Sequence, residues 1–329
     1  MEQGTLFIIC VVLTAYVFDF INGFHDAANS IATIVTTKVL TPLQAVLWAS
    51  LFNFIAFLFF KMAVAHTIGT ELINPAIIDI PLIFSALLSA IFWGLLTWYF
   101  AMPSSSSQAL IGGLAGAAII KGGWITLKWV GLCKIIIGIL VTPFLGLIAS
   151  ITVMFIINRI LRIRNTKTNQ RLLKTLQLIS SACLSITHGT NDAQKTMGII
   201  TLLLFSCSWL QGPFVVPLWV TITCHLALAL GTLTGGWRIV KTMGTEITPL
   251  NPVRGCAAET GAALAIMSAS IFGVPVSTTQ TVAGSIAGVG IFHSARQLNW
   301  TTIRHMVLSW LFTIPATALV AAGIMWGIT

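Results

Sequence analysis

The residue patterns best suited to chemistry are two polar motifs, and each of them occurs twice in the chain. Residues 103–108 read Pro-Ser-Ser-Ser-Ser-Gln, and residues 275–280, placed 172 positions later, read Pro-Val-Ser-Thr-Thr-Gln. Residues 23–29 read Gly-Phe-His-Asp-Ala-Ala-Asn, and residues 189–195, placed 166 positions later, read Gly-Thr-Asn-Asp-Ala-Gln-Lys. Both copies keep the same order along the chain, which predicts an internal duplication.

The hydroxyl-rich motif is suited to binding an oxyanion. Proline favours the first turn of a helix, and Ser and Thr favour the N-cap position. Two such helix starts would aim hydroxyl and N–H groups at one point, which binds a tetrahedral oxyanion with few formal charges. The alternative is that the hydroxyls only join neighbouring helices, as the two glycines that follow each motif are expected to do. The predicted anion contacts are Ser104, Ser105, Ser106, Ser107, Gln108, Ser277, Thr278, Thr279 and Gln280.

The second motif places carboxylates in strongly apolar sequence. A carboxylate inside a membrane span costs roughly 3 kcal/mol without a partner, so Asp26 and Asp192 are interpreted as functional groups. Asp26 and Asn29 offer hard oxygen ligands one helical turn apart, which suits a sodium ion or a proton. The predicted coupling-cation residues are Asp26, Asn29, Asn191 and Asp192, with Asp26, Asn29 and Asp192 as the candidate ligands of a sodium ion.

Lys195 stands where the first copy of this motif has Asn29. Its ammonium group could replace a bound cation, pair with an aspartate, or contact the anion. The plain alternative is a purely compensating ion pair between Asp192 and Lys195. We therefore include Lys195 among the candidate anion contacts.

Three further groups are candidate proton carriers. His25 and His188 lie beside the aspartate motifs, and histidine is the side chain best suited to exchange a proton at neutral pH, although a histidine hydrogen-bonded within a packed bundle is an equal alternative. Glu259 is a third carboxylate in apolar sequence. The other four histidines show no metal-ligand spacing, and the six cysteines show no CxxC pair. We expect no structural metal and no cofactor, only a coupling ion, H+ or Na+.

The elements that must position these groups are membrane helices. Of the 329 residues, 57% are hydrophobic and 8% are charged, whereas a soluble domain carries about 25% charged residues. The uncharged stretch 81–116 far exceeds the ~18 apolar residues that mark a membrane span. This composition predicts an all-α polytopic membrane protein. It excludes a soluble enzyme, a secreted disulfide scaffold and a nucleic-acid binder.

We expect ten crossings, and we expect each of the two longest crossings to be interrupted by its polar motif, which gives about twelve helical segments. Five crossings in each half would insert the second half upside down, an inverted-repeat plan that places the site at the midplane. The expected domains are an N-terminal repeat (1–158), a basic loop (159–174) and a C-terminal repeat (175–329). The crossings are expected at 5–36, 42–62, 81–101, 104–120, 130–158, 172–206, 214–237, 253–272, 276–292 and 301–328.

The net charge of +9 indicates membrane orientation rather than a nucleic-acid partner. A Lys/Arg-rich connection between spans marks the cytoplasmic side, so both termini are expected outside a plasma membrane, here a bacterial inner membrane. Lys121, Lys128 and Lys134 then fall outside, against the rule. The basic residues of the segment 159–174 are Arg159, Arg162, Arg164, Lys167, Arg171 and Lys174.

At these motifs the sequence resembles the inorganic phosphate transporter (PiT) family, of the bacterial low-affinity type. The resembling segments are 23–33, 188–198, 231–255 and the two Pro-Ser motifs, and the resemblance covers nearly the whole chain. It implies phosphate import by cation-coupled symport and alternating access, in an inverted-repeat fold with broken helices, often as a homodimer. It maps the family's cation ligands onto Asp26, Asn29 and Asp192, and its phosphate contacts onto the Ser/Thr-Gln clusters.

Two features depart from the family pattern. Many bacterial members have His where this chain has Gln108 and Gln280, so a titratable group is missing at both positions. Sodium-coupled members often carry Asn in both halves, whereas Lys195 occupies the second half here. The second departure favours a proton over sodium as the coupling ion.

The nearest alternative substrate is sulfate, another tetrahedral oxyanion. Phosphate can donate a hydrogen bond through its P–OH group and sulfate cannot, so a carboxylate beside the anion favours phosphate. A metal–phosphate complex is an alternative form of the substrate, and an anion channel is an alternative mechanism. We do not expect an enzyme, because the sequence contains no recognisable nucleophile–base pair.

Overall fold

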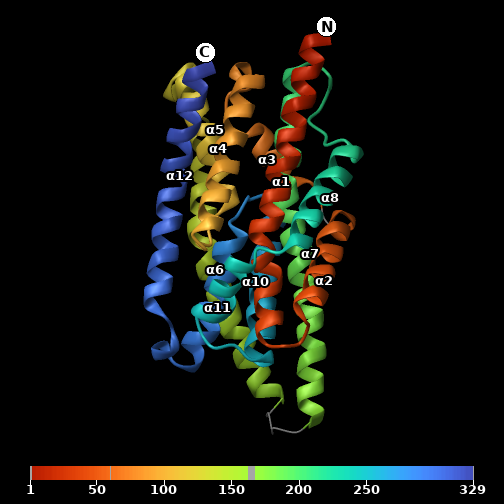
Figure 1. Cartoon of the computed structure of the whole chain (residues 1–329), viewed down its shortest axis with the longest axis vertical. Coiled ribbons are helices and arrows are strands. Elements are labelled where there is room, and N and C mark those ends of the chain that lie inside the picture. The colour runs from red at the N-terminus through yellow and green to blue at the C-terminus, as the bar shows by residue number, and fades with distance from the viewer. Residues whose placement is uncertain (1, 60, 162–166, 329) are drawn as a thin grey trace.

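The computed structural model of the chain describes residues 2–59, 61–161 and 167–328 (Figure 1). Within these ranges an isolated bridge between Ile73 and Leu127 is the only β pairing. Twelve α-helices confirm the predicted all-α fold class and the predicted number of helical segments. They are α1 (Glu2–Thr36), α2 (Pro42–Ile55), α3 (Ala63–Thr70), α4 (Ile80–Tyr99), α5 (Ser106–Gly122), α6 (Trp129–Leu161), α7 (Lys167–Ser206), α8 (Leu218–Thr234), α9 (Trp237–Lys241), α10 (Pro252–Ile271), α11 (Thr278–His293) and α12 (Trp300–Ile328).

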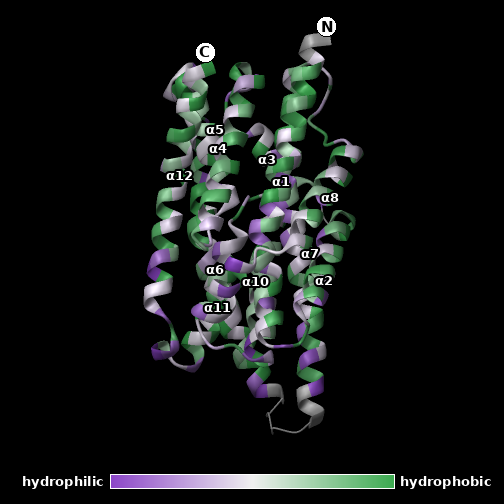
Figure 2. Cartoon of the chain, viewed as in Figure 1, coloured by the Kyte–Doolittle hydropathy of each residue, from purple (hydrophilic) through white to green (hydrophobic). Residues whose placement is uncertain are grey.

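The outer surface of the bundle is apolar, as a lipid environment requires. Leu311, Phe312 and Leu319 on α12 are exposed although they are large and hydrophobic. Figure 2 shows hydrophobic residues along most of the long axis, with hydrophilic residues gathered at the lower end and in the middle of the bundle. An apolar exterior around a polar centre is the reverse of a soluble protein and matches a bundle immersed in lipid.

Four helices of the described part are long and apolar enough to cross a membrane, namely Thr5–Thr36, Ile80–Tyr99, Trp129–Arg159 and Trp300–Ile328. Two bent pairs bring this number to six if each pair is one span. The first pair joins α2 to α3 at a bend of 78°, and the second joins α8 to α9 and the π-helical turn Thr242–Glu246 at a bend of 67°. Both bends therefore lie in the second segment of each half.

The prediction that the two longest crossings are interrupted at their polar motifs is wrong. Helix α1 is continuous over 35 residues and α7 over 40 residues, and both polar motifs lie inside regular helix. The polar side chains find their hydrogen-bond partners on other helices, so the backbone does not have to open to satisfy them. Helices α6 and α7 also extend into the predicted basic loop, of which residues 162–166 lie outside the described residues.

Two helical hairpins meet in the middle of the molecule. Helices α4 and α5 are joined through residues 100–105, and α10 and α11 through residues 272–277. In Figure 1 the α4–α5 hairpin lies toward the end that carries both termini, and the α10–α11 hairpin lies toward the opposite end. Their tips touch, because Ser107 Oγ donates a hydrogen bond to the Val276 carbonyl oxygen at 2.7 Å.

The packing of the helices repeats between the two halves. Helix α1 packs against α4 and α8, while α7 packs against α10 and α2. Helix α5 packs against α12, while α11 packs against α6. Each contact therefore has a counterpart six helices later, and α1 and α7 run in opposite directions along the long axis (Figure 1). This arrangement agrees with two inverted-topology repeats.

The glycines that follow the hydroxyl-rich motifs serve close helix packing, as predicted. A Cβ atom added at Gly116 of α5 would collide with the backbone of Ala318 in α12. A Cβ atom added at Gly288 of α11 would collide with the backbone of Leu147 in α6. Small residues let these backbones approach one another, which is how helices associate in lipid.

The lysines that contradict the positive-inside rule are largely neutralised. Lys121 forms an ion pair with Asp79, and Lys134 forms one with Glu71 at 3.1 Å. Lys128 Nζ donates to the Thr70 carbonyl oxygen at 2.7 Å, at the C-terminus of α3. Paired charges of this kind add little net positive charge to the end of the bundle that carries both termini.

The glycine contacts predict a selective loss of stability. The substitution Gly116→Ala should destabilise the protein by about 1–3 kcal/mol, because the new methyl group overpacks the α5–α12 contact. Gly323→Ala on α12 is a matched control, because a Cβ atom there would meet nothing within 4 Å. Thermal unfolding of both variants in detergent measures the difference. Equal melting temperatures for the two variants would contradict the close approach of α5 and α12.

Candidate functional site

Helix α1 carries a polar stripe on one face. Asp19, Asn22, Asp26, Asn29 and Thr33 are spaced by three and four residues, so their side chains lie on the same side of the helix. All five are at most 2% exposed. A polar stripe buried in the middle of a membrane protein marks an interior site rather than a surface.

Asp26 is surrounded by hydrogen-bond donors from two other helices and from its neighbour His25. Thr279 Oγ1 donates to Asp26 Oδ1 at 3.1 Å, and Ser106 Oγ donates to Asp26 Oδ2 at 3.2 Å. His25 Nδ1 lies 2.8 Å from Asp26 Oδ1, and an ionised Asp26 requires the ring hydrogen on that nitrogen. The other ring nitrogen, His25 Nε2, lies 3.1 Å from Thr97 Oγ1 and 3.3 Å from Ser104 Oγ, so it accepts a hydroxyl hydrogen from this pair. Donors from both hairpin tips thus converge on one carboxylate.

Asp192 has a similar environment in the second half. Thr278 Oγ1 donates to Asp192 Oδ2 at 3.2 Å, and His188 Nε2 lies 3.1 Å from the same oxygen. Lys195 Nζ donates to Asp192 Oδ1 at 2.5 Å, and this lysine is completely buried. The pair Thr278–Asp192 repeats the pair Ser106–Asp26 at equivalent positions of the two motifs. The duplication therefore extends to individual hydrogen bonds.

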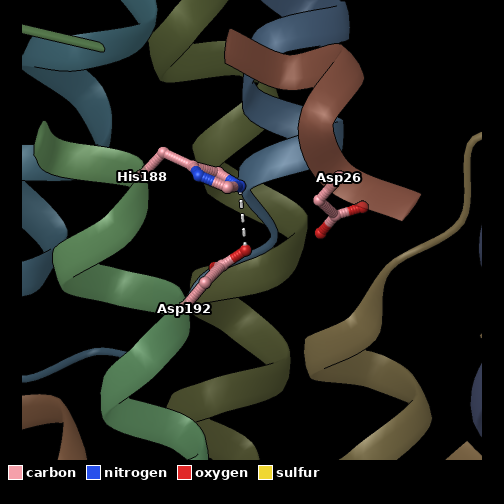
Figure 3. A group of neighbouring side chains, drawn as sticks. All are labelled: Asp26, His188 and Asp192. Carbon is pink, nitrogen blue, oxygen red and sulfur yellow. Dashed lines mark ion pairs between the residues drawn. The ribbon is translucent and has the colours of Figure 1, made fainter. Parts of the chain in front are cut away.

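The two halves of the site meet across the bundle axis. Asp26, His188 and Asp192 each offer one ligand atom, and these atoms all lie within 4.8 Å of one another. Figure 3 shows Asp26 on α1 facing His188 and Asp192 on α7. Two carboxylates this close in a medium of low dielectric constant repel each other strongly unless positive charge compensates them. Lys195 supplies one such charge, and it binds Asp192 rather than Asp26.

Asn29 provides a free oxygen atom beside this centre. Its Nδ2 donates to Thr279 Oγ1 at 3.0 Å, and Thr279 in turn donates to Asp26. Asn29 Oδ1 is buried and has no hydrogen-bond partner in the described part of the chain. The donor set of Asp26 and Asn29 therefore suits a bound sodium ion or, at the carboxylate, a proton.

The predicted anion contacts divide into two groups according to their hydrogen bonds. Ser105 and Ser277 serve as N-caps, since their Oγ atoms accept from the backbone N–H of the residue three positions later at 3.2 and 3.3 Å. Ser104 Oγ lies 2.8 Å from Thr97 Oγ1, and Ser107 joins the two hairpin tips. The hydroxyls that reach the two central carboxylates are those of Ser106, Thr278 and Thr279.

The two glutamines of the hydroxyl-rich motifs make no hydrogen bond to the central carboxylates among the described contacts. Both side chains line an apolar groove of about 310 Å³ between α6, α11 and α12. Gln108 Oε1 is buried there without a partner in the described structure. Phe144 and Trp310 also line this groove, so the environment of the glutamines is mainly apolar.

Two other predicted residues bind elsewhere. Asn191 Nδ2 donates to Ser270 Oγ of α10 at 3.1 Å rather than to either aspartate. Glu259, on α10, forms a separate cluster. Its partner Thr33 follows Asp26 by seven residues on α1, which is about two helical turns. Glu259 accepts hydrogen bonds from Ser180 Oγ at 2.5 Å, Thr33 Oγ1 at 2.6 Å and Gln177 Nε2 at 3.0 Å.

Several residues of the site have no individual sequence motif. His188 Nδ1 lies 3.2 Å from Asn53 Oδ1, and Asn53 Nδ2 donates to Thr232 Oγ1 at 3.0 Å. Thr97 binds His25 from α4. The signal that could identify them is a single polar residue within an apolar helix, which is too common to be specific.

Comparisons with known proteins identify the family of the chain. A family described as the phosphate transporter family matches residues 22–172 and 161–321. A protein of Rhizobium meliloti named "Probable low-affinity inorganic phosphate transporter" is 49% identical over 312 residues, which cover 95% of this chain and 93% of that protein. A protein of Bacillus subtilis with the same name is 40% identical over 324 residues, covering 98% and 97%.

A solved structure has the same fold. It is named "The sodium-dependent phosphate transporter", and it superimposes with a TM-score of 0.90 over 98% of this chain and 99% of that chain, at 22% identity. The matches in sequence and structure extend over nearly the whole chain. The chain therefore belongs to the phosphate transporter family, and it is a multi-pass membrane transporter of phosphate and not an enzyme.

Proposed function

We propose that the chain imports inorganic phosphate by cation-coupled symport and alternating access. The observation that carries this proposal is that the hydroxyls at the hairpin tips hydrogen-bond the two central carboxylates from positions that also suit an oxyanion. Ser106 and Thr279 donate to Asp26, and Thr278 donates to Asp192. The same hydroxyls stand at the helix starts that are suited to an oxyanion.

The anion is expected between the two hairpin tips. The first two backbone N–H groups of an α-helix have no partner within the helix, and they point toward its N-terminus together with the positive end of the helix dipole. These groups belong to Ser106 and Ser107 in α5 and to Thr278 and Thr279 in α11. Four N–H groups and three hydroxyls can bind a phosphate without a cluster of basic residues.

Coupling follows from competition for the hydroxyl hydrogens. An ionised Asp26 repels an approaching phosphate and holds the hydrogens of Ser106 and Thr279. A proton or a sodium ion at Asp26 removes the negative charge and with it the need for those donors. The hydroxyls are then free to donate to phosphate, so cation and anion bind together more strongly than either binds alone.

The second half of the site already contains its cation. The Lys195 ammonium binds Asp192 at 2.5 Å, at the position that corresponds to Asn29 in the first half. One exchangeable cation at Asp26 and Asn29 then completes the charge balance. We favour a proton for this role, with His25 and His188 as neighbouring carriers. The name of the 22%-identical structure supports sodium as the alternative.

The proposal extends to orientation and assembly. The basic residues around 159–174 support a cytoplasmic location for that segment and the outside for both termini. Figure 1 supports the same arrangement, since both termini lie at the end opposite to the last turn of α6 and the first turn of α7. A homodimer in the bacterial inner membrane, and a metal–phosphate complex as the transported species, belong to the same proposal.

The role of Asp26 is tested by a nearly isosteric substitution. Asp26→Asn should lower phosphate uptake into proteoliposomes at least about a hundredfold. The neutral amide cannot make the charge-assisted interaction with the coupling cation, which is worth about 3 kcal/mol. Asp79→Asn is the matched control, since Asp79 caps α4 and asparagine is an equally good N-cap. Normal phosphate uptake by a folded Asp26→Asn protein would reject the coupling role of Asp26.

The identity of the coupling ion is tested by imposed gradients. Uptake into proteoliposomes should respond to an inward proton gradient without sodium, and it should not respond to a sodium gradient at constant pH. Sodium stimulation at constant pH would instead assign sodium to the site formed by Asp26 and Asn29. Omitting both gradients serves as the control, since a channel would continue to conduct under that condition.

Competition between anions tests the choice of substrate. Excess sulfate should leave uptake of labelled phosphate within about twofold of its uninhibited value, because sulfate has no hydrogen to donate to a carboxylate at the site. Unlabelled phosphate is the positive control for competition. Equal inhibition by both anions would favour a general permease for tetrahedral oxyanions.

A further inference from the structure

Asp19 is the exception among the carboxylates inside the bundle. Asp26, Asp192 and Glu259 each have at least three hydrogen-bonding or ionic partners. Asp19 is completely buried, and neither of its carboxylate oxygens has a hydrogen-bond partner in the described part of the chain. A buried carboxylate without any donor is costly, so its environment requires an explanation.

The groups that face Asp19 are also unpartnered. Asn22, one turn later on α1, and Thr196, on α7, are weak hydrogen-bonding neighbours of the carboxylate, although neither contact meets the usual distance and angle limits. Both amide atoms of Asn22 and the hydroxyl of Thr196 are buried without a partner among the described residues. Asp19, Asn22 and Thr196 therefore bring together four buried oxygen atoms that lack a well-formed hydrogen bond, and this set is here called the Asp19 cluster.

Among the described residues, no neighbouring side chain is free to neutralise this cluster. Lys195 is the nearby cation, but its ammonium lies 2.5 Å from Asp192 and is held by that residue. The other ionisable groups that face Asp19 are Asp192 on α7, Cys224 on α8 and Tyr16 on α1, and none of them is a cation. Compensating positive charge must therefore come from a ligand.

We propose that the Asp19 cluster is a second cation site, which receives the coupling ion before it reaches Asp26. Carboxylate, amide and hydroxyl oxygens are hard ligands that suit an alkali cation, and the carboxylate alone suits a proton. This inference rests on the proposed symport function and adds a binding step to it. Each transported cation binds first to the Asp19 cluster and then to Asp26.

The position of the cluster fits such a sequence of sites. Asp19 precedes Asp26 by seven residues on the same face of α1, a separation of about 10 Å along the helix axis. Helix α1 begins at the end of the molecule that carries both termini, so Asp19 lies on that side of Asp26 (Figure 1). In the proposed orientation this is the outer side, from which the cation enters.

A small cavity lies between Asn22 of the Asp19 cluster and two partners of Asp26. Asn22 lines a space of about 10 Å³ together with His25, Ser104 and Ser106. This volume is close to the minimum that one water molecule requires. His25 and Ser106 are both direct partners of Asp26. Asn22 therefore shares a cavity with two direct partners of Asp26, which supports a transfer of the coupling ion in this direction.

The test uses two variants that keep the shape of the cluster. Asp19→Asn removes the charge, and Thr196→Val removes one oxygen ligand. Each variant, purified and reconstituted into proteoliposomes, is assayed for phosphate uptake over a series of proton concentrations and, separately, of sodium concentrations. The concentration of coupling cation that gives half-maximal uptake should rise at least about tenfold in Asp19→Asn. The phosphate affinity at saturating cation should stay within about twofold of that of the unmodified protein.

Matched controls separate this role from a structural one. Asp79→Asn repeats the first substitution at an exposed ion pair, and Thr187→Val repeats the second at a hydroxyl that bonds only the carbonyls of Cys183 and Leu184 in its own helix. Both controls should keep the cation dependence of the unmodified protein. If Asp19→Asn does not fold, Thr196→Val carries the test, and its half-maximal cation concentration should rise at least about threefold.

An unchanged half-maximal cation concentration in a folded Asp19→Asn protein would overturn the second site. A fall in maximal rate alone, without a shift in cation dependence, would overturn it as well. Failure of the proposed function looks different, because the unmodified protein would then show no uptake driven by either cation.

Discussion

Two carboxylates in one apolar centre are the constraint on which the rest of this structure depends. Asp26 and Asp192 come from opposite halves of the chain and, with His188, present ligand atoms within 4.8 Å of one another. Electrostatic repulsion in a medium of low dielectric constant would force them apart without compensation. Lys195 compensates one carboxylate, while hydroxyls from both hairpin tips and His25 supply hydrogen bonds to the other. In the proposed mechanism a phosphate competes for the same hydroxyls, and this competition makes its binding depend on a cation.

The inverted repeat brings these groups together. Each half contributes a long helix with an aspartate and a hairpin whose second helix begins at the centre, so the halves supply equivalent hydrogen bonds from opposite directions. Gly116 and Gly288 hold each hairpin tightly against α12 and α6. The symmetry is broken where function requires a difference. Asn29 leaves an oxygen free beside Asp26, whereas Lys195 occupies the equivalent position beside Asp192.

Much of this architecture could be predicted from the sequence, because composition and duplicated motifs report on it directly. Low charge predicts the membrane, and the repeated Pro-Ser and Asp motifs predict two halves that meet at a polar centre. The sequence could not show that α1 and α7 are continuous, since this depends on donors from other helices. It could not show that Gln108 and Gln280 line an apolar groove, because no local sequence feature determines where these two side chains point. The spacing of Asp19, Asn22 and Asp26 in the sequence places them on one face of a helix. Only the packed structure shows that Asp19 lacks hydrogen-bond partners among the described residues.

The central claim is that phosphate binds only when positive charge neutralises Asp26. It is tested most directly by measuring the equilibrium affinity of the purified protein for phosphate while one cation is varied. Affinity is expressed for a single ionic form of phosphate, with protons titrated in the absence of sodium and sodium titrated at constant pH. The account predicts that the dissociation constant for phosphate falls as the concentration of one of these cations rises, in inverse proportion to it, as thermodynamic linkage requires. A dissociation constant that is independent of both cations would contradict it.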